Sequence, residues 1–236
     1  MNTKLKLRLL AAAVALVLAL IGYFGTPFFK EDNPKGIGAE SIEDVLSKIP
    51  EFDGKPYVVV NDNEPFFTDI PDEPYEEYFE MDLMERCTGA EALIGEELMP
   101  TEERGAIGHV KPSGWHSIKY DFVDGKYLYN RCHLIGYQLT GENATRENLI
   151  TGTRYLNTEG MLPFENMVAD YIKETGNHVY YRVTPIFEGD NLLASGVLME
   201  AKSVEDNGED ICFNVYCYNA QPGVIIDYST GESFAE

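Results

Sequence analysis

The clearest periodic pattern along the chain is a helical repeat of apolar side chains that begins just after Pro163. Apolar residues recur there at spacings of three and four, at Phe164, Met167, Val168, Tyr171 and Ile172. This spacing predicts an amphipathic helix, and a proline is well tolerated in its first turn. A second, shorter helix with an apolar face is predicted in residues 42–46, because Ser41 can cap its start and Pro50 follows as a stop signal.

Apolar runs of strand length make up most of the remaining pattern. They predict strands in residues 56–60, 115–122, 126–134, 178–187, 192–201, 211–218 and 224–228. Asp124-Gly125 is a strong turn signal and predicts a β-hairpin between the second and third of these runs. Residues 149–157 are consistent with the start of a helix. Residues 69–86 are acidic and aromatic, and their weak periodicity predicts no element.

The N-terminus carries a membrane signal. Residues 9–29 form an uncharged stretch of 21 residues after Lys4, Lys6 and Arg8, which is just long enough to cross a hydrocarbon core of about 30 Å. The basic flank favours a cytoplasmic N-terminus and an exported remainder, although a cleaved signal peptide fits nearly as well because the Ala/Leu-rich part is short. We therefore expect a single-pass membrane protein with an extracellular C-terminal domain, or a protein secreted after cleavage.

These signals divide the chain into three parts. Residues 1–25 are interpreted as a signal-anchor or signal peptide, residues 26–50 as a linker with a short helix, and residues 51–236 as one folded domain.

The formal net charge of −22 argues against a uniformly basic nucleic-acid-binding protein. The charge is unevenly distributed, however. Residues 31–103 carry 22 acidic and 4 basic side chains, whereas residues 104–154 carry 4 acidic and 7 basic ones. A polyanion site in the second segment is therefore compatible with the acidic whole, provided that it is small and local.

Four cysteines are present, at Cys87, Cys132, Cys212 and Cys217. An exported chain permits disulfides, but Cys212 and Cys217 would face opposite sides of one strand and so would not pair with each other. No CxxC motif occurs, which argues against a structural zinc site. We expect the cysteines to be free or to form one disulfide, with packing roles.

One short segment carries the candidate chemistry. Asn130-Arg131-Cys132-His133 lies at the end of the predicted strand in residues 126–134, and Asn148, Asn157 and Glu165 follow it along the chain. This order resembles the ββα-metal (His-Me finger) nucleases, specifically the DNA/RNA non-specific endonuclease family with its D-R-G-H motif and its DNA-entry nucleases. The resemblance covers roughly residues 104–230 and continues through these segments in the family's order: 133–137, 147–151, 155–157, 164–165 and 181–184.

The resemblance implies an α+β fold with a central antiparallel sheet, flanking helices and a ββα-metal finger. It makes residues 51–236 a DNA/RNA non-specific endonuclease domain. The implied function is metal-dependent hydrolysis of phosphodiester bonds outside the membrane, with DNA as substrate and RNA as a further candidate.

The residue types suit this chemistry. His133, neutral near pH 7, can take a proton from water as a general base. Asn157 can offer its amide oxygen to Mg²⁺, which keeps several waters and needs few protein ligands, and Mn²⁺ is expected to substitute. Glu165 is expected to order water around the metal. Such a metal polarises the phosphate and stabilises the departing oxyanion.

The remaining candidates contact substrate. Three arginines are candidates for bidentate phosphate contacts: Arg131, Arg154 and Arg182. We also group Arg131 with His133 and Glu165 as catalytic. Arg131 and Arg182 match family positions, whereas Arg154 rests on charge and proximity. Asn148 matches a family asparagine, and we expect it to order a loop or contact substrate.

Two positions depart from the family motif. Asn130, included among the substrate-binding candidates, stands where the family has Asp, and Cys132 stands where it has Gly. The missing carboxylate admits an alternative, a catalytically silent extracellular module for nucleic-acid binding or uptake. Cys132 is expected to face away from His133 in a strand and to stay outside the chemistry. A third interpretation, an exported acidic interaction domain unrelated to nucleic acid, is the least favoured of the three, because it does not explain why the motifs occur in the family's order.

Overall fold

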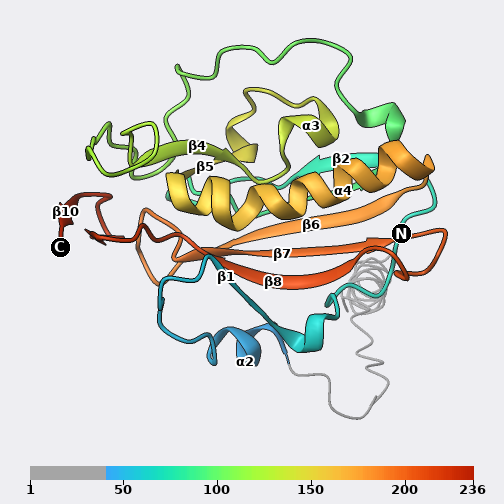
Figure 1. Cartoon of the computed structure of the whole chain (residues 1–236), viewed down its shortest axis with the longest axis horizontal. Helices are drawn as coiled ribbons and strands as arrows, with labels where there is room; N and C mark the ends of the chain where they lie inside the picture. Colours follow the sequence, from blue (N-terminus) through green and yellow to red (C-terminus); the bar gives the residue numbers. More distant parts are fainter. Residues whose placement is uncertain (1–40) are drawn as a thin grey trace, which may run out of the picture. The chain divides into compact units, whose positions relative to one another are not determined.

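The computed structural model describes residues 41–236, and at their centre lies a six-stranded sheet in the order β1-β8-β7-β6-β3-β2 (Figure 1). Every neighbouring pair is antiparallel, which confirms the predicted central sheet. The strands are β1 (Tyr57–Val59), β2 (Tyr75–Tyr78), β3 (Ala90–Ile94), β6 (Val179–Ile186), β7 (Gly196–Ser203) and β8 (Cys212–Tyr218).

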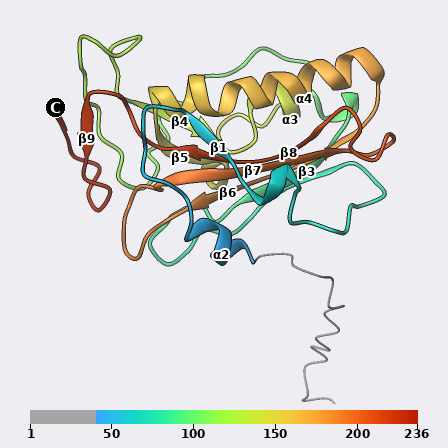
Figure 2. The same ribbon diagram turned by 60° about the horizontal axis from the view of Figure 1, so that its bottom comes forward.

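Alternating side chains give the sheet an apolar core on each face. Val197 and Met199 point into a large core on one face, whereas Leu198 between them joins a smaller core with Val45 and Val60 on the other. This alternation follows from the two-residue period of a β-strand. Helix α4 (Leu162–Thr175) and helix α2 (Ile42–Leu46) therefore cover opposite faces of the sheet, as Figure 2 shows.

A ββα unit packs on the face that α4 covers. It consists of β4 (Tyr129–His133), the antiparallel β5 (Leu149–Thr153), a π-helical turn (Leu156–Met161) and α4. The apolar face of α4 joins the large core through Phe164, Val168, Ala169 and Ile172. This confirms the helix predicted from the repeat after Pro163, which lies in its first turn.

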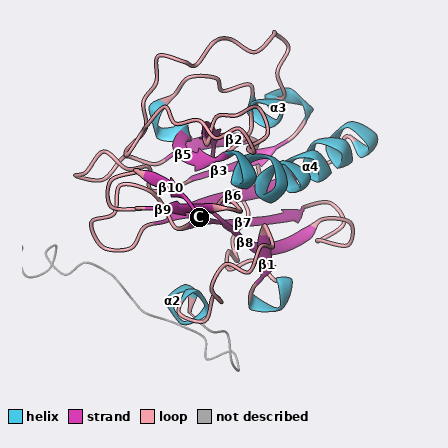
Figure 3. Cartoon of the chain, turned by 60° about the vertical axis from the view of Figure 1, so that its left-hand side comes forward, coloured by secondary structure: helices cyan, strands magenta, loops and turns pink. Residues whose placement is uncertain are grey.

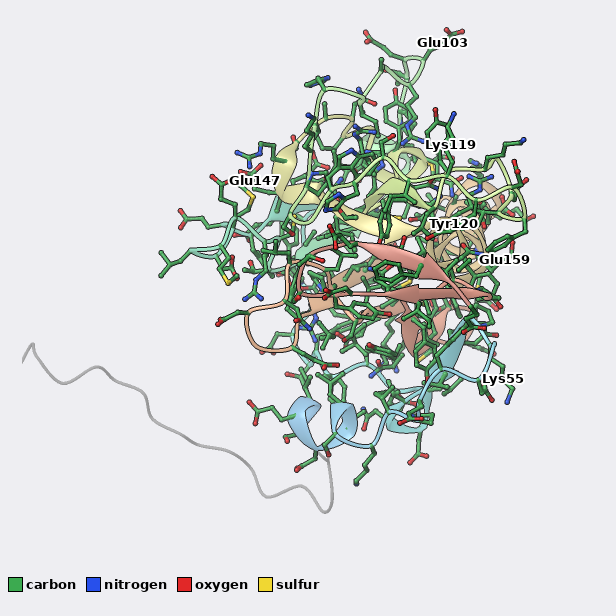
Figure 4. The ribbon with its side chains drawn as sticks, turned by 90° about the vertical axis from the view of Figure 1, so that its left-hand side faces the viewer. Lys55, Glu103, Lys119, Tyr120, Glu147 and Glu159 are labelled. Carbon is green, nitrogen blue, oxygen red and sulfur yellow. The ribbon has the colours of Figure 1, made fainter. Side chains whose placement is uncertain are left out.

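The predicted hairpin around Asp124-Gly125 is present only in part: the chain folds back antiparallel there, with Tyr120 N–H donating to Lys126 C=O and Leu128 N–H donating to Ile118 C=O. Residues 115–122 form no strand, and a single β-bridge joins Lys119 to Tyr127. The tight turn itself is present, because Gly125 has a φ of 68° and Lys126 donates its backbone N–H to Val123. Residues 115–122 instead fold onto a small third core through side chains such as Tyr120, labelled in Figure 4. The partner of β4 comes from later in the chain.

That partner, β5, occupies the segment in which we predicted a helix start. All five of its residues are buried, and a short segment buried on both faces shows neither strand alternation nor a helical stripe. Helical backbone does follow, from Arg154 onward, and it continues into the π-helical turn at Leu156. The sequence pattern also missed β2 and β3.

The other elements are close to the predicted ones. Strands β6, β7, β8 and β9 (Val224–Ile226) and helix α2 fall within or near the predicted ranges. Short helix α3 (Tyr137–Thr140) follows β4, and β10 (Ser233–Ala235) pairs with β9 near the C-terminus (Figure 3). All four cysteines are free.

The predicted signal-anchor or signal peptide, and most of the predicted linker, lie outside the described residues. Within residues 41–236, no helix has the length and apolar character needed to span a bilayer. The three-part division of the chain stays a prediction.

A charged cluster joins β6 to two neighbouring loops. The Nδ1 atom of His178 lies 2.6 Å from Glu205, and its Nε2 atom lies 3.1 Å from Glu97. The hydrogen bond to Glu205 is the largest cause that raises the pKa of His178, against the opposing effect of burial. The pKa values of Glu97 and Glu205 are both lowered, in part by His178. The arrangement therefore favours a protonated imidazolium beside two ionised carboxylates.

We expect His178→Gln to reduce the free energy of unfolding by about 0.5–1 kcal/mol near pH 5.5, and by much less near pH 8.5. A raised pKa gives a contribution that is complete below the unfolded value of 6.5 and is lost as pH rises through the folded value. The contribution of the two carboxylates is lost only when pH falls below their usual 4.5. Urea titrations at both pH values measure the difference. Exposed His109 offers the control His109→Gln, and an equal loss at both pH values would contradict the assignment.

Candidate active site

A cleft of about 1080 Å³ opens between the ββα unit and the long loop that joins β3 to β4. The loop contributes Arg104, Lys111 and Trp115 to its wall. Figure 4 labels Glu103, the neighbour of Arg104, at the outer end of this loop. The ββα unit contributes six of the eight predicted site residues: Asn130, Arg131, His133, Arg154, Asn157 and Glu165. The fold therefore brings together side chains that lie far apart in sequence, and it leaves Asn148 and Arg182 outside the cleft wall.

His133 is held in one tautomer by two different partners. Its Nε2 atom lies 2.8 Å from the backbone carbonyl of Asn143, and its Nδ1 atom lies 3.2 Å from the Arg104 guanidinium. A carbonyl only accepts and a guanidinium only donates. The proton therefore sits on Nε2, and the lone pair of Nδ1 is the basic site.

Burial keeps this imidazole neutral. His133 is 6% exposed, and burial, followed by the nearby Arg104 charge, lowers its pKa, while the Asn143 carbonyl and Glu142 act in the opposite direction. A neutral histidine with a bare Nδ1 can accept a proton near pH 7.

Glu165 lies in the first turn of α4 and reaches the cleft beside Gly136. A Cβ atom added at Gly136 would lie 2.8 Å from the Glu165 carboxyl carbon. A side chain at position 136 would therefore clash with the carboxylate in its present position. Burial raises the pKa of Glu165 to about 7, while the Arg104 charge acts in the opposite direction. Near neutral pH the group is therefore divided between its protonated and ionised forms.

The three predicted arginines differ in their surroundings. Arg131 donates to the backbone carbonyls of Gly108 and Val110 and stacks on Trp115, with its guanidinium carbon 3.9 Å from the ring centroid. It therefore fastens the long loop to β4 as well as lining the cleft. Its pKa is lowered by burial.

Arg154 also lines the cleft, but it already binds a carboxylate. Its Nε and Nη2 atoms lie 3.0 and 2.7 Å from Asp124 Oδ2. This pair connects the end of β5 to the tight turn at Gly125.

Arg182 is placed elsewhere. It belongs to the central sheet, where it pairs with the fully buried Glu200 on the neighbouring strand at 2.8 Å and lies over the Phe67 ring. Arg182, predicted to bind phosphate, thus forms an ion pair within the sheet. The order of the family motifs along the chain could not show this, because it does not tell which face of β6 a residue occupies.

Asn148 is fully buried and serves the backbone. Its amide group accepts a hydrogen bond from Ile135 N–H at 2.9 Å and donates one to Ile135 C=O at 3.0 Å. It thereby fixes the chain two residues beyond His133.

The two motif departures have clear surroundings. Asn130 lines the cleft, and its side chain makes no hydrogen bond with the described residues. Cys132 is fully buried in the large core. A Cβ atom at Gly152 would lie 2.3 Å from its sulfur, so the missing side chain on the facing strand makes room for the thiol. Burial raises the pKa of Cys132 far above its usual range, so the thiol stays protonated.

Arg104 is the functional candidate that sequence reasoning missed. Besides its contact with His133, no carbonyl or carboxylate among the described residues accepts a hydrogen bond from it. It follows an acidic segment in sequence, and nothing in the local pattern separates it from other surface arginines.

The family model for DNA/RNA non-specific endonucleases matches residues 69–205, more than half of the chain. The chain belongs to the DNA/RNA non-specific endonuclease family.

Solved nuclease structures share the fold. Magnesium-bound NucA from Streptococcus agalactiae is similar with a TM-score of 0.71 and 23% identity, over 82% of this chain and 94% of that one. Sda1 nuclease with bound zinc is similar with a TM-score of 0.58 and 29% identity, over 69% of this chain and 81% of that one. An extracellular endonuclease is similar with a TM-score of 0.57 and 19% identity, over 78% of this chain and 100% of that one. Together with the family match, these structures confirm the predicted family and fold class and support a nuclease, that is, a hydrolase of nucleic acid.

The nuclease cleft offers oxygen ligands to a cation. The side chains of Asn157 and Glu165 both line it, and neither forms a hydrogen bond with another described residue. An amide oxygen and a carboxylate are the donors that hard cations prefer. Within residues 41–236 no group of three His, Cys, Asp or Glu side chains could hold a metal. The donor set therefore fits a cation that keeps most of its water, such as Mg²⁺.

We expect Asn148→Ala to lower the free energy of unfolding of the nuclease by about 2–3 kcal/mol, because it leaves a buried N–H and a buried C=O of Ile135 without partners. Guanidinium titration measures the loss. Asn166 lies at the surface and bonds only to Gln138, so Asn166→Ala is the matched control, with an expected change below about 0.5 kcal/mol. Similar values for the two variants would show that the Ile135 contacts contribute little.

Proposed function

We propose that this nuclease is a metal-dependent endonuclease that hydrolyses phosphodiester bonds of DNA, with RNA as a further candidate substrate, and that His133 is its general base. The observation that carries the proposal is the buried imidazole of His133 in the cleft wall, whose Nε2 atom is held by the Asn143 carbonyl and whose Nδ1 atom contacts Arg104, in a cleft that is also lined by the oxygen-bearing side chains of Asn157 and Glu165.

His133 would hold the proton taken from the attacking water. Water must reach Nδ1 to be activated, and Arg104 now contacts that atom. A phosphate in the cleft attracts the Arg104 guanidinium, which can bind two phosphate oxygens at once. Movement of Arg104 toward the substrate therefore frees Nδ1 at the moment when it is needed.

Asn157 and Glu165 would hold the metal, with Mg²⁺ as the proposed ion and Mn²⁺ as a substitute. When bound, it would supply charge stabilisation at the phosphate and the departing oxygen. Glu165 must be ionised to bind the metal. Because its pKa is about 7, part of the population is already ionised near neutral pH, and a bound cation would favour that form further. Lys111 and Arg104 would hold substrate phosphates in the cleft.

The site of action is proposed to be outside the membrane. The apolar segment with its basic flank supports export, and one structural neighbour is described as an extracellular endonuclease. Attachment to the membrane through residues 1–25 is the proposed alternative to release after cleavage.

Plasmid cleavage tests the general base. We expect the wild type to nick and linearise supercoiled plasmid with Mg²⁺ and to leave it intact in EDTA, and His133→Ala to lower the rate by about 10²–10⁴-fold. His109→Ala controls for loss of an exposed histidine. An intact plasmid with both Mg²⁺ and Mn²⁺ would refute the proposal, and DNA binding without cleavage would favour the silent module.

The metal ligand has a separate test. We expect Asn157→Ala to raise the Mg²⁺ concentration for half-maximal cleavage by at least about tenfold, because a direct ligand is lost. Isothermal titration with Mg²⁺ alone gives a readout independent of activity. Asn166→Ala should leave both quantities unchanged, and a normal Mg²⁺ affinity in Asn157→Ala would remove Asn157 from the metal site.

A further inference from the structure

The carbonyl that fixes the His133 tautomer belongs to a loop, residues 142–145, that forms no helix or strand. Residues 142–145 lie between Gly141, which ends α3 with a φ of 70°, and the short 3-10 turn that begins at Arg146. Asn143 provides the carbonyl, but its own side-chain oxygen is buried and has no hydrogen-bond partner in the described part of the chain. The side chain of Asn143 therefore does not explain why its backbone points at His133.

Glu142 supplies the missing support. Its Oε1 atom accepts hydrogen bonds from three successive backbone N–H groups, those of Asn143, Ala144 and Thr145, at 2.9, 3.3 and 3.3 Å. A carboxylate bound by several backbone donors makes stronger hydrogen bonds than a neutral acceptor. Burial alone would raise the pKa of Glu142, but the hydrogen bonds from Thr145, Asn143 and Ala144 lower it, so the charge is retained.

The same loop also contacts the segment that carries Arg104. A Cβ atom added at Gly105 would lie 2.7 Å from the side-chain nitrogen of Asn143, so these two segments are in close contact. Residue 143 thus binds His133 Nε2 through its carbonyl, while its side chain lies beside Gly105, the neighbour of the arginine that contacts Nδ1.

We infer that Glu142 is a positioning residue, which organises the 142–145 loop so that the Asn143 carbonyl holds His133 with its proton on Nε2 and its basic Nδ1 toward the cleft. Glu142 itself does not line the cleft. The inference rests on the proposed function only for its effect on catalysis, since the tautomer is a property of the free protein.

The test compares Glu142→Ala and Glu142→Gln with Glu147→Ala. Glu147 belongs to the same connection and is labelled in Figure 4. Its side chain makes no hydrogen bond or ion pair with other described residues, so it is the matched control. Long-range ¹H–¹⁵N spectra of the histidine rings, with His133 identified by its loss in His133→Ala, distinguish protonated from bare ring nitrogens.

We expect wild type and Glu147→Ala to show His133 as the Nε2–H tautomer, and Glu142→Ala to show a mixture of the two tautomers. The kcat for plasmid cleavage should fall by about 10–100-fold in Glu142→Ala, with KM within about threefold, because a small displacement of the base is costly. Glu142→Gln keeps an acceptor oxygen without the charge and should be intermediate. If Glu142→Ala does not fold, Glu142→Gln carries the test.

An unchanged tautomer in the Glu142 variants would overturn the inference, even if kcat falls, because the loss would then come from general destabilisation. A changed tautomer in a protein that cleaves no DNA in its wild-type form would leave Glu142 as a positioning residue and refute the proposed function instead. The two failures are therefore distinguishable.

Discussion

Packing of the ββα unit against one face of the central sheet is the constraint on which the cleft depends. The large core combines Cys132 and Ile150 from the β4–β5 pair, Val168 and Ile172 from α4, and the sheet residues beneath them. Because protein interiors are close-packed, this shared core fixes the end of β4 relative to the start of α4. His133 and Glu165 stand at those two places, so apolar packing sets the relative position of their backbones.

Charge and geometry together define the kind of polyanion site that this acidic chain can support. Four cationic side chains line the cleft: Arg104, Lys111, Arg131 and Arg154. Two of them already donate hydrogen bonds to acceptors within the protein. Arg131 binds backbone carbonyls and Arg154 binds Asp124. Because the whole chain has a formal net charge of −22, long-range attraction of DNA is weak. In the proposed reaction, substrate binding would then depend on short-range contacts from Arg104 and Lys111 and on the proposed cation.

The sequence predicted what is locally encoded and failed where partners come from a distance. Helix α4 carries its full apolar repeat in its own residues, so it was predicted correctly. The turn at Gly125 is also local, but only a short antiparallel contact forms around it, because β4 pairs along its length with β5, about twenty positions further on. Complete burial removes the polar–apolar alternation of strand β5, so its sequence alone does not distinguish it from the start of a helix. The motif order identified the family and gathered six candidates in one cleft, yet it could not show that Arg182 pairs with Glu200 or that Arg104 reaches His133.

Burial has opposite effects on the two central titratable groups, and Arg104 connects them. It lowers the pKa of His133 and raises that of Glu165, in both cases because the charged form loses hydration. The Arg104 charge lowers both. In the proposed reaction, a phosphate that draws Arg104 away from Nδ1 would remove part of what keeps the His133 pKa low, and His133 would become a stronger base as substrate binds. A cation beside Glu165 would take over the role of Arg104 there and keep the carboxylate ionised. In the proposed reaction, the arginine that contacts the Nδ1 atom of His133 in the free protein is therefore also the group through which substrate binding would activate it.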